Sequence, residues 1–108
     1  MAEGHRCDHW RSAALNYGDL LVRRGEVAGG RDVLDILIQR DPFSGEAALL
    51  ECAVRRAEGE AGFALDAFLR AAAMVDGIDS IFNWVDDAAR AALESGRGDE
   101  LAAWVTRC

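Results

Sequence analysis

The chain has 108 residues, of which 51% are hydrophobic and 29% are charged, and its formal net charge is -7. These values are typical of one small globular domain and argue against a disordered chain. The acidic charge would repel nucleic-acid phosphates, and no apolar run approaches the roughly 20 residues that span a bilayer. We therefore expect a domain that binds neither nucleic acid nor membrane.

The cysteines and the first residues bear on the cellular compartment. Cys7, Cys52 and Cys108 are odd in number and far apart, so they form no disulfide framework. The run from Met1 to His5 lacks the basic and apolar regions of a signal peptide. Free cysteines are typical of a reducing compartment, and we expect a cytoplasmic protein.

The spacing of apolar residues predicts helices along almost the whole chain and no strand. Asp8 is expected to cap the first helix and Ser44 the third, because their side-chain oxygens can accept hydrogen bonds from the first helical turn. Pro42 is the single proline and ends the second helix. The expected helices are 8–24, 27–40, 44–58, 61–75, a fifth from Asp79 or Ser80 to about Gly96, and a short sixth after Gly98.

Glycine returns with a regular spacing between these helices. Gly25 and Gly59 are 34 residues apart, and each follows one apolar helix and precedes another, while Gly96 follows after 37 residues. A period of this size is typical of helical repeat proteins, whose hairpins bury their apolar faces against one another. We expect a flexible N-terminus over 1–7 and one repeat domain over 8–108, with antiparallel hairpins at about 8–41, 42–76 and 77–108.

Small residues occur inside the expected helices. A glycine in a helix interior costs about 1 kcal/mol relative to alanine, so its presence indicates that two helices approach closely there. The residues expected at such close approaches are Gly18, Gly30, Cys52, Ala64 and Ala89.

The pattern resembles the tetratricopeptide repeat family. The segment 17–25, with Tyr17 and Gly18 at its start, is similar to the first helix and turn of that repeat. Glu51 departs from the pattern because the family has an apolar residue there, and Asp76 replaces the closing proline of the second unit. The further matches are Gly30, Leu34, Leu37 and Pro42 in the first unit and Gly59, Ala64, Phe68 and Ala71 in the second.

The resemblance implies an all-α fold, a right-handed superhelix of about three antiparallel hairpins, in which the first helix of each pair lines a concave groove. An apolar centre of Leu15, Val22, Leu49 and Leu93 between charged rims would suit an amphipathic helix or an extended peptide. A bare solvated surface is the alternative. The expected groove residues are Leu15, Asn16, Asp19, Val22, Arg23, Leu49, Arg56, Asn83, Asp86, Asp87, Arg90 and Leu93.

Some members of this family grip a terminal carboxylate with lysines and asparagines. Leu15, Asp19 and Asp87 occupy the corresponding sites here, so the acidic tails of large chaperones are not the expected ligands.

Candidate catalytic and metal-binding residues are few. His5, Cys7, Asp8 and His9 lie within five residues, but a tetrahedral site needs a further ligand cluster that the sequence lacks. Cys52 is expected to be a buried, unreactive thiol, because both histidines lie in the first nine residues. We expect no enzyme activity, no metal and no cofactor.

The C-terminal end is a second candidate contact. Leu101, Trp104 and Val105 lie on the last expected helix, which has no following repeat in this sequence to cover it. We expect this end to meet a partner or a second copy of the chain. The alternative is that Trp104 folds back onto Val85 or Phe82.

These observations predict a protein-binding module, an adaptor or chaperone that holds a helical or extended segment of another protein in its groove. One alternative is a chaperone similar to those that bind the needle subunit in bacterial type III secretion, which are also small, acidic and built from about three such repeats. Another alternative is a structural subunit that assembles with copies of itself through its uncovered end.

Overall fold

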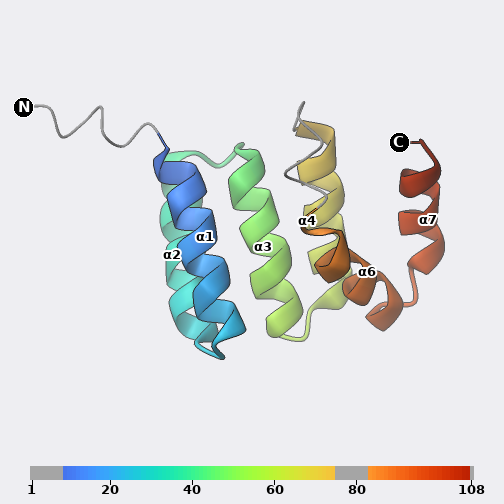
Figure 1. Cartoon of the computed structure of the whole chain (residues 1–108), viewed down its shortest axis with the longest axis horizontal. Helices are drawn as coiled ribbons and strands as arrows, with labels where there is room; N and C mark the ends of the chain where they lie inside the picture. Colours follow the sequence, from blue (N-terminus) through green and yellow to red (C-terminus); the bar gives the residue numbers. More distant parts are fainter. Residues whose placement is uncertain (1–8, 75–82, 108) are drawn as a thin grey trace, which may run out of the picture.

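The computed structural model describes residues 9–74 and 83–107, and all regular structure within them is helical (Figure 1). This confirms the all-α prediction. The helices within these residues are α1 (Trp10–Arg23), α2 (Val27–Arg40), α3 (Gly45–Ala57), α4 (Ala61–Met74), α6 (Val85–Glu94) and α7 (Gly98–Arg107).

The helix starts agree only in part with the predicted caps. Ser44 caps α3 as predicted, because its hydroxyl accepts a hydrogen bond from the Ala47 amide at 3.0 Å. The cap predicted at Asp8 is corrected, because His9 directly precedes α1 and makes no side-chain capping bond. Asp8 itself lies outside the described residues. The expected fifth-helix start at Asp79 or Ser80 also lies outside them, and α6 begins at Val85.

The returning glycines share one backbone conformation. Gly25 and Gly59 both have φ +85° and Gly96 has φ +73°, which is the left-handed region that glycine adopts without strain. The Gly25 amide donates to the Val22 carbonyl at 3.0 Å, and the next amide donates back to Leu21 at 2.8 Å. This is the usual glycine ending of a helix, so the sequence spacing marks the same turn three times.

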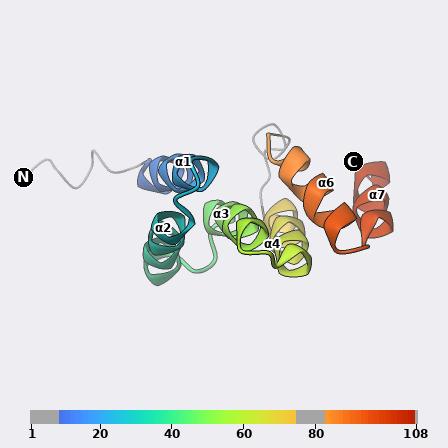
Figure 2. The ribbon, with the colours of Figure 1, turned by 90° about the horizontal axis from the view of Figure 1, so that it is seen from below.

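The helices stand side by side along a molecule that is 50 Å long and 20 Å thick (Figure 1). α1 packs with α2 and α3 with α4, as the expected hairpins require. The last pair differs, because α6 is tilted and lies chiefly against α4, and α7 contacts it less extensively than the earlier partners contact each other (Figure 2).

The core is centred on α3 and α4, where Leu50, Val54, Leu65 and Phe68 are fully buried. Burial of such side chains is the main stabilising contribution in a domain of this size.

Close approach of helices was predicted at five small residues, and the first hairpin shows it most clearly. A Cβ on Gly30 would lie 2.6 Å from a Val22 methyl and 3.2 Å from the Gly18 carbonyl oxygen. A Cβ on Gly18 would lie 2.7 Å from a Leu50 methyl. Among the other predicted positions, Cys52 and Ala64 are fully buried and Ala89 is half-buried.

Ion pairs lie on the outside of the core, both between hairpins and within one. Arg97, between α6 and α7, donates to Asp66 of α4 at 2.7 Å and to the Gly62 carbonyl at 3.0 Å. Glu51, the residue that departs from the repeat pattern, accepts from Arg70 at 2.7 Å and from Arg55 at 3.3 Å. A charged side chain is accommodated at that site because two arginines neutralise it.

The lengths and hydropathy of the described helices also bear on membranes. None of them is long and apolar enough to cross a bilayer.

Candidate functional site

Two cavities lie in line on one side of the molecule, between α1, α3 and the start of α6. Figure 2 shows α1 and α6 standing on the same side of α3. The larger, the charged groove, has a volume of about 420 Å³ and is lined by Asp19, Val22, Arg23, Ala53, Arg56, Ala57, Asp86, Asp87 and Arg90. The smaller, the Trp84 cavity, has a volume of about 240 Å³ and is lined by Ser12, Leu15, Asn16, Gly45, Glu46, Leu49, Asn83 and Trp84.

Helix geometry explains why these residues meet. Residues three, four or seven positions apart share one face of a helix. The lining residues follow this spacing on α1, on α3, and on α6 with the turn before it. One face of each of these helices is therefore turned to the cavities. The stripes are Asn16, Asp19 and Arg23 on α1, Leu49, Ala53 and Arg56 on α3, and Asn83, Asp87 and Arg90 at α6.

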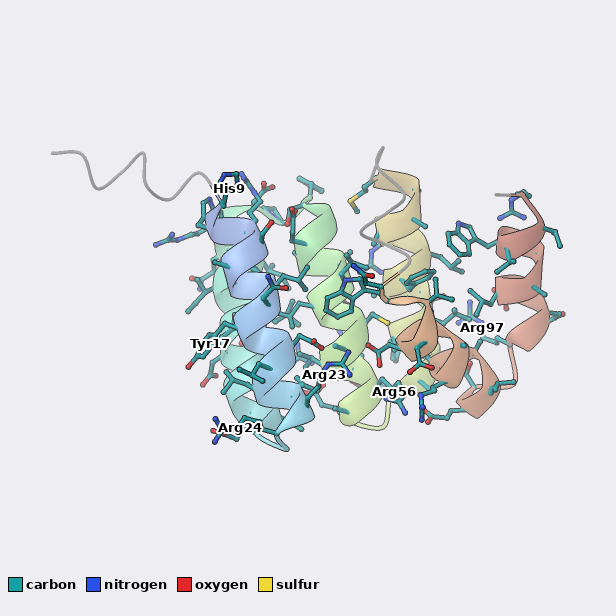
Figure 3. All side chains as sticks on the ribbon, in the orientation of Figure 1. His9, Tyr17, Arg23, Arg24, Arg56 and Arg97 are labelled. Atoms are coloured by element: carbon teal, nitrogen blue, oxygen red, sulfur yellow. The ribbon has the colours of Figure 1, made fainter. Side chains whose placement is uncertain are left out.

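Asp87 is the centre of the charged groove. Its carboxylate lies 3.3 Å from Arg23 Nη2 and 3.8 Å from Arg56 Nη1, and only 11% of its side chain is exposed. Burial raises the pKa of Asp87 above its ordinary value of 3.8, although the nearby arginines act in the opposite direction. Arg23 and Arg56 both lie near the lower part of α3 in Figure 3. The groove therefore holds a poorly solvated carboxylate between two guanidinium groups.

Arg56 has an unused hydrogen-bond donor. Its Nη2 donates to Glu94 at 3.3 Å, but its Nε is buried and has no hydrogen-bond partner among the described residues. A buried N–H without an acceptor is uncommon, because the lost hydration is then uncompensated. An occupant of the groove would satisfy it only if the Arg56 side chain turned to expose the Nε.

The lining of the charged groove carries both signs. Three aspartates stand against three arginines, and the pairs are arranged along the groove rather than separated to opposite walls. Arg23 donates to Asp19 at 2.7 Å, and Arg90 donates to Asp86 at 3.0 Å on the exposed rim. Exposed pairs of this kind contribute little stability, so an occupant can exchange them at small cost.

The expected apolar centre of the groove is wrong. Leu15 and Leu49 line the Trp84 cavity, but they are only 7% and 4% exposed and belong to the core. Leu93 is 77% exposed and lies outside both cavities, with a methyl near the start of α7. Val22 remains as a half-buried apolar wall of a groove whose centre is charged.

Sequence reasoning brought most of these residues together correctly but missed Trp84. This side chain is 7% exposed and covers the floor of the smaller cavity beside Leu15 and Leu49. Its position directly after Asn83, a predicted groove residue, was the signal available in the sequence.

The C-terminal end also differs from expectation. Leu101 is 8% exposed, and Trp104 packs edge-to-face on Phe68 with ring centroids 5.2 Å apart, so both face the core. The expectation that Leu101 forms an outer contact is therefore corrected. Trp104 folds back on Phe68, whereas the alternative drawn from the sequence named Val85 or Phe82 as its partner, and Phe82 lies outside the described residues. Val105 is half-exposed.

The Cys52 thiol and the side chains that could ligate a metal are the other candidate reactive groups. Burial raises the pKa of the Cys52 thiol to about 12, so it is protonated at neutral pH, as the prediction of an unreactive thiol requires. Within the described residues no three His, Cys, Asp or Glu side chains gather as metal ligands. His5, Cys7 and Asp8 lie outside those residues.

No protein-family model matches this chain, and no curated protein or solved structure shows significant similarity to it. The functional argument therefore depends on the geometry and chemistry of the two cavities.

Proposed function

We propose that this chain is a protein-binding module, an adaptor or chaperone whose hairpins form a right-handed superhelix of the tetratricopeptide type and hold a segment of another protein. The observation that carries this proposal is the alignment of the two cavities. They follow one another along α1 and α3, and all three hairpins contribute to them. Two cavities in line suit an extended polypeptide better than a compact small molecule.

The chemistry of the lining defines the segment. Over the charged groove, a peptide carbonyl or a carboxylate would accept from Arg56, whose side chain is 28% exposed and would turn its Nε toward the occupant. Basic side chains of the segment would lie against the aspartates and acidic ones against Arg23 and Arg90. We therefore propose a segment that carries both charges rather than a uniformly acidic or basic one.

The Trp84 cavity supplies a pocket for one side chain. Its floor of Leu15, Leu49 and Trp84 is apolar, while Asn16 and Asn83 at its edge are exposed. Asparagine amides can both donate to and accept from a peptide backbone. One apolar side chain of the segment would enter here, about one or two helical turns from the charged contacts.

A displayed library of random 12-residue peptides tests this proposal. Peptides selected on the native protein should lose at least tenfold in affinity when Arg56→Ala is introduced, about 1.4 kcal/mol or more. Arg70→Ala is the matched control, because Arg70 pairs with Glu51 and lines neither cavity. Circular dichroism should show both variants folded. Substitution of Leu49 is unsuitable because that residue is buried in the core.

The site of binding is checked by amide chemical-shift mapping with a selected peptide. The shifts should concentrate at residues of the charged groove and the Trp84 cavity. Failure to select any specific peptide, equal affinity of the Arg56→Ala variant, or shifts centred elsewhere would each contradict the proposal.

A further inference from the structure

Arg23 contacts two carboxylates of the charged groove at once. Its Nε lies 2.7 Å from Asp19 on its own helix, and its Nη2 lies 3.3 Å from Asp87 on α6. The side chains of the two aspartates are only 18% and 11% exposed, whereas that of Arg23 is 57% exposed. The two carboxylates are therefore fixed in the wall of the groove, while the guanidinium group between them belongs to a side chain that solvent reaches.

The place that the Arg23 guanidinium occupies favours a cation. The hydrogen bond to Asp19 raises the pKa of Arg23 above its ordinary value, and attraction by Asp87 and Asp86 acts in the same direction, although burial opposes it.

The other two arginines of the groove have carboxylates of their own. Arg90 pairs with Asp86 at 3.0 Å, and Arg56 pairs with Glu94 at 3.3 Å. Arg56 also faces Asp87, but at 3.8 Å its Nη1 is beyond hydrogen-bond distance.

One guanidinium group does not satisfy both Asp19 and Asp87. Hydrogen bonds between a guanidinium and a carboxylate are typically about 2.7–2.9 Å long. The contact of Arg23 with Asp19 has this length, but the nitrogens that face Asp87 lie at 3.3 Å on Arg23 and 3.8 Å on Arg56. Burial accordingly raises the pKa of Asp87 in spite of both arginines. A cation that approached Asp87 more closely would stabilise its carboxylate.

Arg23 can turn out of the groove at small cost. It is the last residue of α1, and its exposed ion pairs contribute little to stability. A long arginine side chain also regains rotamer freedom when it is released into solvent. Figure 3 shows Arg23 on the side of α1 that faces α3, next to the cavity of about 420 Å³ that would admit another side chain in its place.

From these observations we propose that the charged groove binds an arginine side chain of the partner segment between Asp19 and Asp87, in the place of the Arg23 guanidinium. Arg23 is then an internal competitor that the segment displaces into solvent. Arginine suits the position better than lysine, because its planar group donates to two carboxylates at once, as Arg23 does. The inference rests on the proposed function and names the side chain that the groove selects.

Removal of the internal competitor tests the proposal. In amide chemical-shift titrations, N-acetyl-arginine amide should bind the Arg23→Ala variant about threefold more tightly than the native protein, the scale expected when exposed pairs no longer compete. Arg24→Ala is the matched control, since it removes the same charge from a neighbour that pairs with Glu26 and lines neither cavity. This control should bind the probe as the native protein does. N-acetyl-citrulline amide, a neutral probe of similar shape, should bind none of the three.

A second substitution locates the bound cation. Adding Asp87→Asn to Arg23→Ala should abolish the gain in affinity, while circular dichroism shows the double variant folded. Equal affinity of the Arg23→Ala variant and the native protein, an equal gain in Arg24→Ala, or a gain that persists in the double variant would each overturn the proposal.

The two proposals fail separately. If no peptide is selected from the library, the proposed function fails whatever the arginine probe does. If peptides are selected but Arg23→Ala binds them no more tightly than the native protein does, the assignment of an arginine to this place fails alone.

Discussion

The first and third hairpins contain the same turn but pack very differently. In the first, Gly30 brings α2 against α1, whereas the register places Ala64 at this position in the second hairpin and Leu101 in the third. The helices α6 and α7 pack less extensively, and each has only ten residues, against 14 in α1 and α2. The difference teaches that the two pairs with a glycine or an alanine at this position pack extensively, whereas the pair with a leucine does not.

The looser packing of the third hairpin also affects the lining of the two cavities. The looser and tilted α6 brings Trp84, Asp87 and Arg90 over the α3 side of the molecule. The first two hairpins supply most of the core, and the third supplies five of the 17 residues that line the two cavities.

The largest expected effect is at the tight seam. Gly30→Ala should destabilise the protein by about 1–3 kcal/mol in chemical denaturation, because the new methyl collides with Val22 and approaches the Gly18 carbonyl. This loss would exceed the gain of about 1 kcal/mol in helix propensity. Gly29→Ala is the matched control, since its Cβ would meet only a Leu21 methyl at 3.3 Å, and it should be neutral or stabilising. Equal effects of the two substitutions would show that seam volume does not distinguish the hairpins.

A smaller and more local effect is expected at the loose end. Trp104→Ala removes the edge-to-face contact with Phe68 and should cost about 1–2 kcal/mol. Hydrogen exchange should accelerate in α7, while amides of α1 and α2 keep their native protection. Val105→Ala, on the exposed side of α7, should change neither the stability nor the hydrogen-exchange rate of α7. Uniform acceleration throughout the chain would mean that the third hairpin unfolds together with the first two.

The smallest expected effect concerns Asp87. Because its pKa is raised in the folded state, the folded protein holds the Asp87 proton more tightly than the unfolded chain does. At neutral pH the ionised Asp87 carboxylate therefore lowers the free energy of unfolding relative to asparagine. This loss of stability disappears as the pH falls through the raised pKa of Asp87 and the carboxylate takes up a proton. Asp87→Asn should leave stability at pH 7 unchanged or raise it by up to about 1 kcal/mol.

Thermal unfolding of the Asp87→Asn variant and the native protein between pH 7 and about pH 3 measures this difference, which should shrink on acidification. A variant that is less stable at pH 7 and equals the native protein only in acid would show that attraction by Arg23 and Arg56 outweighs burial.

Local features of the fold were predictable from the sequence. Helical periodicity, the Ser44 cap and the glycine turns each depend on a few neighbouring residues, and the structure agrees with them. Close approach at Gly18 and Gly30 was also predictable, since a helix tolerates glycine poorly without a packing reason.

The chemistry of the groove was less predictable, because it depends on contacts between distant segments. Arg23 meets Asp87 across 64 residues, and Leu15 and Leu49 line a cavity together with Trp84 of the irregular third hairpin. Asp86, Asp87 and Arg90 of α6 line the groove as predicted, but Leu93 lies near the start of α7 and outside both cavities.

The burial of Cys52 makes the rate of its alkylation a measure of how often the protein opens. Its sulfur lies in the packed centre of α3 and is fully shielded, so an alkylating reagent can reach it only when neighbouring helices separate. The rate at which mass spectrometry finds Cys52 alkylated therefore reports how often the centre of the molecule opens. An occupant that clamps α1, α3 and α6 together would slow that rate without touching the sulfur.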